Sequence, residues 1–540
     1  MIHHLTGLAH RAGLEIWSAG LLARTGVLKP LTPRQLAGMA SAVRTYGLLG
    51  AASTITALRD PDGVALIDER GPLTFRELDA RANAVANGWR KRGVRAGAGV
   101  AILCRNHRGF FDAVYAAGKC GARIILLNTG FGAEQLADVA SREGVDLLVH
   151  DEEFTDLTGG ISLRFGRILA WNEGGDTDTL DALITGGDDS SPPAPGGRPK
   201  IIILTSGTTG TPKGAKRSEP YSLIPVGGLL GKVPFRAREV TECPVPLFHS
   251  LGFSQAMIGI VFGSTLVIRR QFDPSSTLES LAENSATALV VVPIMLRRIL
   301  DVAPPHVQLP DLRVIFAGGS QLGAALCRRA TEVFGPVVYN MYGSTEVAFA
   351  TIATPADLTA EPGCVGGVVA GTEVRILDAD DRPVPPGIPG RIFVGNGLQF
   401  DGYTSGGTKQ IVDGMLASGD VGHFDSAGRL FIDGRDDEMI VSGGENVFPG
   451  EVEDALEEHP DVAEAAVVGV DDLEFGQRLR SFVVTRPGAT LAAGDVKAYV
   501  AQRLARFKVP RDVVFVDSLP RNPSGKVLKR LLDRGPATDG

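Results

Sequence analysis

The stretch ILTSGTTGTPKGAK, from Ile203 to Lys216, decides how the rest of the chain is interpreted. An apolar run ends at a series of hydroxyl side chains and glycines, and Lys213 follows. A strand that enters such a turn can present backbone N–H groups and hydroxyls together, an arrangement that binds anions. A Walker A loop does not fit, because Pro212 precedes the lysine and Gly214 follows it. The stretch is therefore predicted to be a phosphate-binding loop of another kind.

Length, charge and cysteine content limit the classes of protein to consider. A chain of 540 residues exceeds the size at which one hydrophobic core keeps growing, so we expect at least two domains. The formal net charge of −8 argues against a nucleic-acid partner, which usually requires a basic face. The five cysteines are far apart and form no CxxC pair, so buried free thiols are expected rather than a zinc site or disulfides.

The pattern of strands and helices predicts an α/β fold. From about residue 50, short β-branched runs alternate with helical segments such as TFRELDARANAVANGWRKRGV, in which Thr74 and Glu77 form a capping box. Near residue 365 the pattern changes to short alternating strands, typical of a small antiparallel barrel. A compact α+β segment follows, and the boundary between the two domains is predicted near residues 434–437. We therefore expect a helical extension (1–49), a large domain of layered α/β subdomains with a barrel-like β subdomain (50–435), and a small mobile α+β lid (436–540).

The first residues predict an amphipathic helix. Apolar residues recur at helical spacing, namely Leu5, Leu8, Ala12, Ile16, Ala19 and Ala23. Charged residues interrupt them, so neither a membrane-spanning helix nor a signal peptide is predicted. Docking of this stripe on the protein's own surface is the expected arrangement, and contact with a membrane surface is the alternative.

Further motifs occur in a fixed order along the chain. They are PLFHSLG (246–252), AGGSQL (317–322), YNMYGSTE (339–346), SGDVGHFD (418–425), GRDDEMIVSGGENVFPGEVE (434–453) and PRNPSGKVLK (520–529). Together with the phosphate loop, the chain from about 50 to 530 resembles the adenylate-forming superfamily of acyl-CoA synthetases, luciferases and nonribosomal adenylation domains. Within it, the chain looks most similar to bacterial medium- and long-chain fatty-acid–CoA ligases.

The resemblance implies a two-step reaction. A carboxylate attacks the α-phosphate of ATP to give acyl-adenylate and pyrophosphate, and a thiol, usually coenzyme A, then displaces AMP. ATP, Mg²⁺ and coenzyme A are thus the expected cofactor and substrates, and a cytoplasmic location, with or without peripheral membrane contact, is expected. The oligomeric state stays open.

The resemblance also assigns residues to ATP. Glu346 would bind Mg²⁺, Thr345 would contact the α-phosphate, and Tyr342 would lie against adenine. Asp420 would accept from the ribose hydroxyls, with Arg435 close by. The full implied ATP and AMP set is Thr205, Ser206, Gly207, Thr208, Thr209, Gly210, Lys213, Gly318, Gly319, Ser320, Asn340, Met341, Tyr342, Gly343, Ser344, Asp420 and Arg435.

Other residues are implied to act at the acid, the thiol and the pivot between domains. Lys526 would stabilise the transition state of adenylation, and it joins Thr345, Glu346 and His249 as the implied catalytic residues. Asp437 would be the hinge, and Gly443 and Gly444 would line the tunnel for coenzyme A. The acyl pocket is assigned to His249, Gly252 and Phe253, with His249 shaping or gating the pocket rather than acting as a base.

The acid itself is predicted from the segment after His249. SLGFSQAMIGIVFGSTLVI is apolar and rich in small residues, which suits a hydrophobic tunnel and equally a buried core helix. The Asp that amino-acid-activating domains place near this motif is missing, so a medium- or long-chain fatty acid is favoured. A fatty acyl-AMP ligase that serves a carrier protein is the first alternative, although its characteristic insertion is not seen. A non-catalytic lipid-binding protein is the second.

Overall fold

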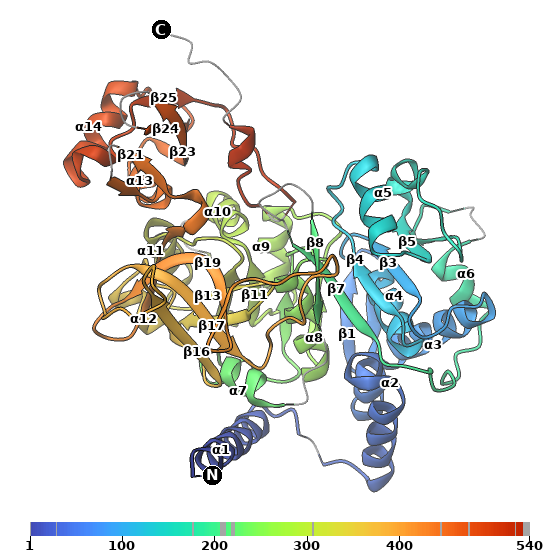
Figure 1. The fold of residues 1–540 in the computed structure, drawn as a ribbon. Coiled ribbons are helices and arrows are strands. Elements are labelled where there is room, and N and C mark those ends of the chain that lie inside the picture. Colours follow the sequence, from blue (N-terminus) through green and yellow to red (C-terminus); the bar gives the residue numbers. More distant parts are fainter. Residues whose placement is uncertain are drawn as a thin grey trace.

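The computed structural model describes residues 2–28, 30–174, 178–205, 212–217, 222–304, 307–442, 445–472, 476–523 and 525–532. Four β-sheets with flanking helices make up the molecule, which confirms the predicted α/β class with a large body and a small C-terminal part (Figure 1).

The largest sheet has nine strands and carries the centre of the body. Its order is β15–β14–β13–β12–β11–β9–β10–β1–β2. The strands from β13 to β1 are parallel to their neighbours, and β14, β15 and β2 add antiparallel edges. The bounds are β1 (Val64–Asp68), β2 (Gly71–Thr74), β9 (Val240–Glu242), β10 (Thr265–Val267), β11 (Ala288–Val291), β12 (Val314–Gly318), β13 (Val338–Ser344), β14 (Ala348–Ala353) and β15 (Gly367–Val368).

A second, six-stranded sheet lies beside it in the order β6–β5–β3–β4–β7–β8, parallel except for β8. Its strands are β3 (Gly99–Leu103), β4 (Arg123–Leu126), β5 (Leu147–Asp151), β6 (Arg167–Trp171), β7 (Lys200–Thr205) and β8 (Lys213–Arg217). Strands β3 and β5 are fully buried, as expected for a parallel sheet that is covered on both faces.

Two smaller sheets complete the fold. The antiparallel sheet that the sequence predicts near residue 365 consists of β16 (Thr372–Leu377), β17 (Gly390–Asn396), β18 (Ile411–Val412), β19 (Met415–Phe424) and β20 (Leu430–Arg435). The C-terminal sheet consists of β21 (Ile440–Ser442), β22 (Glu445–Val447), β23 (Val462–Asp472), β24 (Gly476–Thr485) and β25 (Asp512–Phe515). The chain therefore passes from one sheet to the next between Arg435 and Ile440.

Helices cover the sheets. They are α1 (Ile2–Arg24), α2 (Pro33–Arg59), α3 (Phe75–Lys91), α4 (Arg108–Lys119), α5 (Ala133–Arg142), α6 (Leu180–Thr185), α7 (Ile224–Leu230), α8 (Ser250–Phe262), α9 (Pro274–Glu283), α10 (Pro293–Val302), α11 (Ala324–Phe334), α12 (Pro355–Ala360), α13 (Pro449–Glu457) and α14 (Ala493–Arg503). The predicted capping box of α3 is present, because the Thr74 and Glu77 side chains each accept a hydrogen bond from the other's backbone N–H. Within the described ranges, no helix has the length and hydrophobicity needed to cross a bilayer.

Helix α2 crosses α4 at two glycines. A Cβ added at Gly50 would lie 2.8 Å from the backbone of Gly118, and a Cβ at Gly118 would lie 2.8 Å from the Gly50 Cα. Only a residue without a side chain allows two helix backbones to approach so closely. The crossing fixes the N-terminal extension to the second sheet's helical layer.

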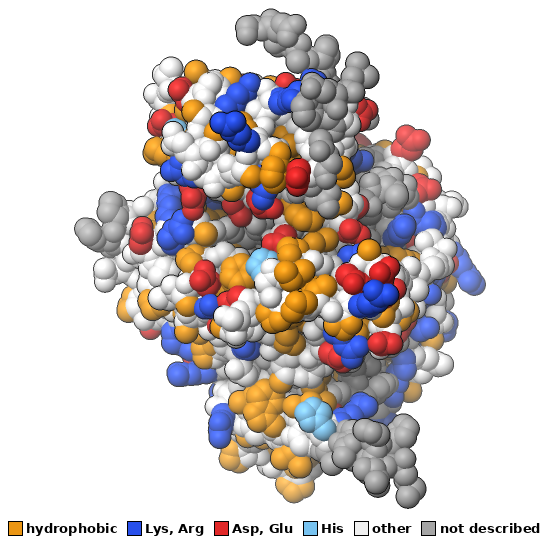
Figure 2. All heavy atoms as spheres, turned by 60° about the vertical axis from the view of Figure 1, so that its left-hand side comes forward, with side chains coloured by type: hydrophobic (Ala, Val, Ile, Leu, Met, Phe, Trp, Pro, Cys, Tyr) orange, Lys and Arg blue, Asp and Glu red, His pale blue; other side chains and the backbone are white. Residues whose placement is uncertain are grey.

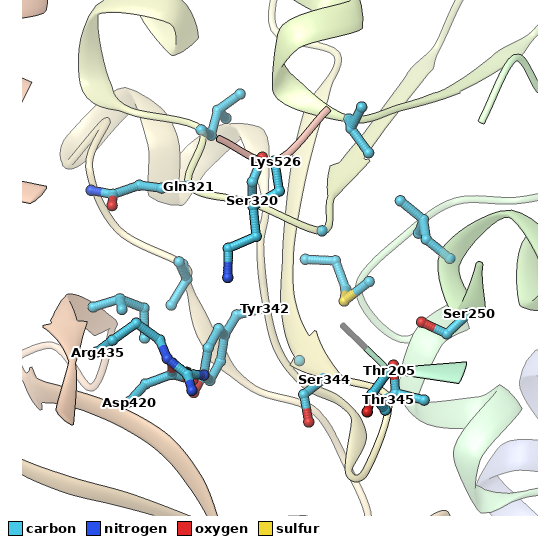
Figure 3. Close-up of a pocket in the computed structure, with 18 of the residues that line it drawn as sticks. Thr205, Ser250, Ser320, Gln321, Tyr342, Ser344, Thr345, Asp420, Arg435 and Lys526 are labelled. Carbon is cyan, nitrogen blue, oxygen red and sulfur yellow. Dashed lines mark hydrogen bonds and ion pairs between the residues drawn. The ribbon is translucent and has the colours of Figure 1, made fainter. Parts of the chain in front are cut away.

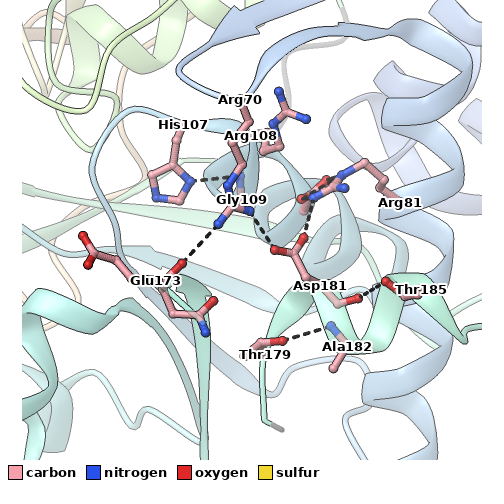
Figure 4. Close-up of polar contacts among 12 residues, drawn as sticks. Arg70, Arg81, His107, Arg108, Gly109, Glu173, Thr179, Asp181, Ala182 and Thr185 are labelled. Atoms are coloured by element: carbon pink, nitrogen blue, oxygen red, sulfur yellow. Dashed lines mark hydrogen bonds and ion pairs between the residues drawn. The ribbon is translucent and has the colours of Figure 1, made fainter. Parts of the chain in front are cut away.

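Arginine–carboxylate contacts join the two large sheets (Figure 4). Arg70, in the turn between β1 and β2, pairs with Asp181 of α6 at 2.7 Å. Arg81 of α3 pairs with Asp112 of α4 at 2.7 Å and with Asp181 at 3.3 Å. Because Asp112 is fully buried, loss of Arg81 would leave an uncompensated internal charge.

A buried cluster at the carboxyl ends of β3 and β5 has the composition of a metal site. Ligand atoms of Cys104, His107 and Asp151 lie within 4.8 Å of one another. Both histidine nitrogens already have partners, since Nδ1 accepts from Gly109 N at 3.1 Å and Nε2 lies 2.7 Å from Asp151 Oδ1. The first contact makes Nε2 the protonated nitrogen. His107 therefore caps α4 and orients Asp151.

All five cysteines are buried and free, as predicted.

Candidate active site

A cavity of about 680 Å³ opens where the first three sheets meet the C-terminal part of the chain. Most of the predicted site residues line it, namely Thr205, Lys213, His249, Gly319, Ser320, Asn340, Met341, Tyr342, Gly343, Ser344, Thr345, Glu346, Asp420, Arg435 and Lys526. Figure 3 shows side chains from different sheets pointing into the same space. The cavity therefore unites motifs that are more than 300 residues apart in sequence, from Thr205 to Lys526.

Several predicted residues lie elsewhere. Gly318, Gly252, Phe253 and Asp437 do not line the cavity. Phe253 is 6% exposed within the main core, and Gly252 packs against the backbone of Pro246. On the wall near His249, Ser250 and Leu251 occupy the place predicted for Gly252 and Phe253. Ser206, Gly207, Thr208, Thr209, Gly210, Gly443 and Gly444 lie outside the described residues.

The floor of the cavity lies at the ends of two parallel strands. β12 and β13 end side by side, and the residues that follow each strand line the cavity. This is the usual place for a ligand, outside the carboxyl ends of parallel strands. Gly319 follows β12 with a φ of 88°, a conformation that glycine adopts without strain. The turn therefore exposes backbone to the cavity.

A tyrosine and an arginine hold the predicted ribose acceptor. The Tyr342 hydroxyl donates to Asp420 Oδ2 at 2.6 Å, and Arg435 Nη1 lies 3.2 Å from Asp420 Oδ1. Asp420 and Arg435 face each other across β19 and β20. Burial, the Asp420 charge and this hydrogen bond raise the pKa of Tyr342, so the phenol stays protonated and remains a donor. Each carboxylate oxygen keeps a lone pair for a ligand.

Glu346 is a buried carboxylate that stays ionised. It is 7% exposed, and its oxygens accept from Tyr403 at 2.7 Å and from Ser344 at 2.9 Å. Burial alone would raise the pKa of Glu346, but Lys409 and these two hydroxyls outweigh it and lower the pKa. An ionised oxygen donor set of this kind, inside a cavity lined by phosphate-binding motifs, fits Mg²⁺.

His249 lines the same cavity. It precedes α8, and its ring lies 4.4 Å from that of Phe248. Burial lowers the pKa of His249 to about 4, so the imidazole is neutral at pH 7. Its Nε2 is buried and has no hydrogen-bond partner in the described part of the chain. A buried polar atom without a partner on a cavity wall is available to a ligand.

Lys526 reaches the cavity from the C-terminal segment. In Figure 3 its side chain extends into the space above Tyr342. The preceding Gly525 has a φ of 82°, and a Cβ there would lie 2.3 Å from Ile294 Cγ2 of α10. The loop therefore sits tightly on the large domain. The Lys526 side chain is exposed and lines the cavity, so its charge can reach a ligand there.

Helix α13 presents acidic side chains to the body. Gln321 donates to Asp454 at 2.9 Å, Arg297 pairs with Glu457 at 2.5 Å, and Arg328 pairs with Glu458 at 2.9 Å. Burial, with the neighbouring glutamates adding to it, raises the pKa of Asp454 to about 7. Protonation of Asp454 therefore favours this orientation of the two parts.

Sequence reasoning missed the residues that support the predicted ones. Tyr403 and Lys409 hold Glu346, and Lys529 pairs with Glu453 at 2.8 Å and with Glu438 at 3.3 Å. Lys529 stands at the end of the motif PRNPSGKVLK and was open to prediction. Tyr403 and Lys409 lie in DGYTSGGTKQ, where the only signal is an aromatic and a basic residue within a glycine-rich turn.

Comparison with known proteins supports the same interpretation. Residues 54–404 match the AMP-binding enzyme family, and residues 451–526 match the AMP-binding enzyme C-terminal domain. The first match covers well over half of the chain and contains the phosphate loop, His249 and Glu346. The second begins within α13 and ends at Lys526.

Individual relatives extend over nearly the whole chain. A feruloyl-CoA synthase from Amycolatopsis is 32% identical over 90% of this chain and 98% of its own length. A fatty acid–[acyl-carrier-protein] ligase, ScoC, from Streptomyces coeruleorubidus is 29% identical over 88% and 94%. The o-succinylbenzoate CoA synthetase of Bacillus subtilis, solved with its acyl-adenylate, has a TM-score of 0.80 at 27% identity and covers 90% and 98%. The chain therefore belongs to the AMP-binding enzyme family of the adenylate-forming superfamily, and it is an AMP-forming acid–thiol ligase.

Proposed function

We propose that the enzyme activates an apolar carboxylic acid, most specifically a medium- or long-chain fatty acid, and transfers it to coenzyme A. The lining supports an apolar acid, because it includes Val245, Leu251, Val292 and Met341 together with the uncharged imidazole of His249.

Charge pairing in the cavity supports the exclusion of amino acids. Its acidic lining residues all have basic partners: Glu346 has Lys409, Asp420 has Arg435, and Glu438 and Glu453 share Lys529. Each carboxylate of the described lining therefore already faces a basic side chain, which weakens its attraction for an α-amino group. This pairing is the observation that carries the proposal.

The first step uses the paired nucleotide side. The acid oxygen forms a bond to the α-phosphorus of ATP, and the bond to pyrophosphate breaks. Asp420 would accept from ribose, Tyr342 would lie against the base, and Thr345 would donate to the α-phosphate. Glu346 would hold Mg²⁺, and the ion would supply positive charge against the phosphates. The Lys526 ammonium would stabilise the charge that develops at the phosphorus.

The second step needs the C-terminal part to turn. The thiolate of coenzyme A attacks the acyl carbon, and AMP leaves. Asp437, in the short segment between β20 and β21, is the proposed pivot, and Gly443 and Gly444 are proposed to border the pantetheine path. Arg435 Nε lies 3.0 Å from Asp437 Oδ1, so the proposed pivot residue contacts a residue of the proposed nucleotide side.

Transfer to a carrier protein is the second candidate, because one relative, ScoC, is named as a fatty acid–carrier-protein ligase. Two other relatives are named for feruloyl and o-succinylbenzoyl groups, so aromatic acids belong in any test.

The test is a panel of acids supplied with ATP and Mg²⁺, with either coenzyme A or a carrier protein, and thioesters are measured by mass spectrometry. Octanoate, palmitate, ferulate, indoleacetate and malonate span the choices. Fastest turnover of the fatty acids with coenzyme A is expected. Faster turnover of ferulate would move the substrate to aromatic acids, and faster malonate turnover would contradict an apolar pocket.

A further inference from the structure

Helix α1 is attached to the protein by the face opposite to its apolar stripe. The predicted stripe includes Ala12, Ile16, Ala19 and Ala23, and all four are exposed. Ile16 is 74% exposed. The expectation that this stripe docks on the protein's own surface is therefore wrong.

Polar and mixed contacts hold the other face of α1 against α7. Glu15 accepts from the Ser222 hydroxyl at 2.7 Å and from the Leu223 N–H at 3.0 Å. Ser18 is fully buried, and Leu22 joins an apolar cluster around Phe262. Glu15, the only acidic residue of the helix, is thus turned inward together with Leu22, whereas Ile16 and the three alanines of the stripe face solvent.

The charge of the extension differs in sign from that of the whole chain. The first 59 residues contain six Lys and Arg residues and one acidic residue, whereas the formal net charge of the chain is −8. Arg11 and Arg24 stand at either end of the exposed stripe and are themselves exposed. No acidic side chain lies between them except Glu15, which faces α7.

Other exposed hydrophobic side chains belong to the same extension. Leu28 is 67% exposed and Leu36 is 53% exposed. Helix α1 and the start of α2 project from the end of the molecule opposite the C-terminal sheet (Figure 1). In Figure 2 that end shows hydrophobic side chains with basic and histidine side chains beside them. A soluble protein rarely leaves so many large apolar side chains together on one projection without a binding partner.

We propose that α1, Leu28 and Leu36 form a docking surface for an anionic lipid bilayer, with the apolar stripe in the headgroup region and the arginines on lipid phosphates. A basic amphipathic helix with low net hydrophobicity binds in this way. A second copy of the chain is a poorer fit, because two such surfaces would bring like charges together.

The position of this surface in the fold determines how a docked enzyme would be oriented on the bilayer. Leu22 and Val27 pack with Ile258 and Phe262 at the end of α8. The other end of α8 follows His249 at the cavity, about 20 Å away for a helix of 13 residues. An enzyme docked through α1 therefore turns the end of α8 toward the bilayer, and its C-terminal part faces the aqueous side.

The test is binding of the full-length enzyme to vesicles by flotation. Vesicles of phosphatidylcholine alone are compared with equimolar phosphatidylcholine and phosphatidylglycerol, at low and at high ionic strength. We expect binding to the anionic vesicles only, and weaker binding at high ionic strength. Ile16→Asp should lower the partition coefficient about tenfold, because it removes one inserted side chain and adds an anion.

Two further variants check that binding depends on α1 and on its positive charge. Ile388→Asp changes another isoleucine, 50% exposed, outside the extension and should leave binding unchanged. Arg11→Glu should weaken binding to anionic vesicles without changing the folded state, because the side chain is exposed.

Tryptophan fluorescence locates the contact. Trp17 is 41% exposed, whereas Trp89 is fully buried and Trp171 lies between Arg70 and Arg270. Quenching by bilayers that contain brominated lipid should therefore disappear in Trp17→Phe.

Three results would overturn the proposal: no binding to anionic vesicles, equal binding of wild type and Ile16→Asp, or conversion of a dimer to a monomer by Ile16→Asp. The last would identify the surface as a contact between two copies. Adenylation of a soluble acid is measured in parallel and should be equal in both proteins, so a wrong substrate assignment would not affect this test.

Discussion

The two sides of the cavity are built differently. On the nucleotide side, Asp420 and Glu346 already have hydroxyl and cationic partners that fix their positions. On the acid side, the Nε2 of His249 is buried with no described partner, and its neighbours are apolar. The proposed nucleotide side is thus preorganised by polar contacts, whereas the proposed acid side is shaped by packing. Substitutions should therefore abolish chemistry on the first side and change preference on the second.

The largest effect is expected from Glu346→Gln. An amide cannot replace the ionised oxygen donor, so acyl-adenylate formation should fall about 10³-fold. Pyrophosphate release without thiol measures it, and Glu373→Gln, a surface carboxylate paired with Arg375, is the matched control. Near-normal release by Glu346→Gln would remove Glu346 from the metal site.

Lys526→Ala comes next. Loss of a transition-state charge contact of about 3–4 kcal/mol should slow adenylation about 10²- to 10³-fold. Thioester formation from supplied acyl-AMP and coenzyme A should change little. Single-turnover rates of the two steps are compared, with Lys497→Ala of α14 as control.

Asp437→Pro should show the opposite pattern, because proline restricts the backbone at the proposed pivot. Adenylate should accumulate while transfer to coenzyme A stalls. Equal losses in both steps for both variants would contradict rotation about this segment.

Tyr403→Phe should slow adenylation about tenfold. The change removes one hydrogen bond to the Glu346 carboxylate, worth about 1.5 kcal/mol, and keeps the ring under Lys213. A rise in the Mg²⁺ concentration needed for half-maximal rate distinguishes a positioning role from a loss of fold. Tyr499→Phe is the control. An unchanged Mg²⁺ dependence would show that the nucleotide side does not need this partner.

The acid side is tested with His249→Ala. The KM for the acid should rise about tenfold while the KM for ATP stays the same, because only a ligand on the acid side needs Nε2. The pKa of His249 is lowered to about 4, so acid binding should not change between pH 6 and 8. Ser250→Ala is the neighbouring control. Equal rises in both KM values would abolish the distinction between the two sides.

The smallest effect concerns Asp454. Its pKa is raised to about 7 in the observed orientation, so this orientation binds a proton that a solvent-exposed carboxyl would have lost. As the pH rises through 7, the orientation is weakened, and adenylation should fall about threefold relative to Asp454→Asn. Glu458→Gln is the control, and parallel pH profiles for Asp454→Asn and wild type would contradict the interpretation.

Local sequence patterns were enough to predict much of the fold. The α/β class, the capping box of α3 and the change to an antiparallel sheet followed from periodicity, and fifteen of the residues that line the cavity followed from the motifs and the family that they resemble. The partners of those residues did not, since Tyr403 and Lys409 reach Glu346 only when two separate sheets meet. The sequence also did not predict which face of α1 contacts the protein. Periodicity shows that an apolar stripe exists, but it does not show that Glu15 anchors another face of the helix to α7.

Arg435 contacts both the proposed ribose acceptor and the proposed pivot. One guanidinium contacts Asp420 at 3.2 Å and Asp437 at 3.0 Å. Its donors are limited in number and direction, so a phosphate or ribose that draws Arg435 toward itself must loosen the contact to Asp437. Departure of that ligand restores the contact. If Asp437 is the pivot, a ligand in the cavity would change, through this one side chain, how stiffly the two parts of the enzyme are joined.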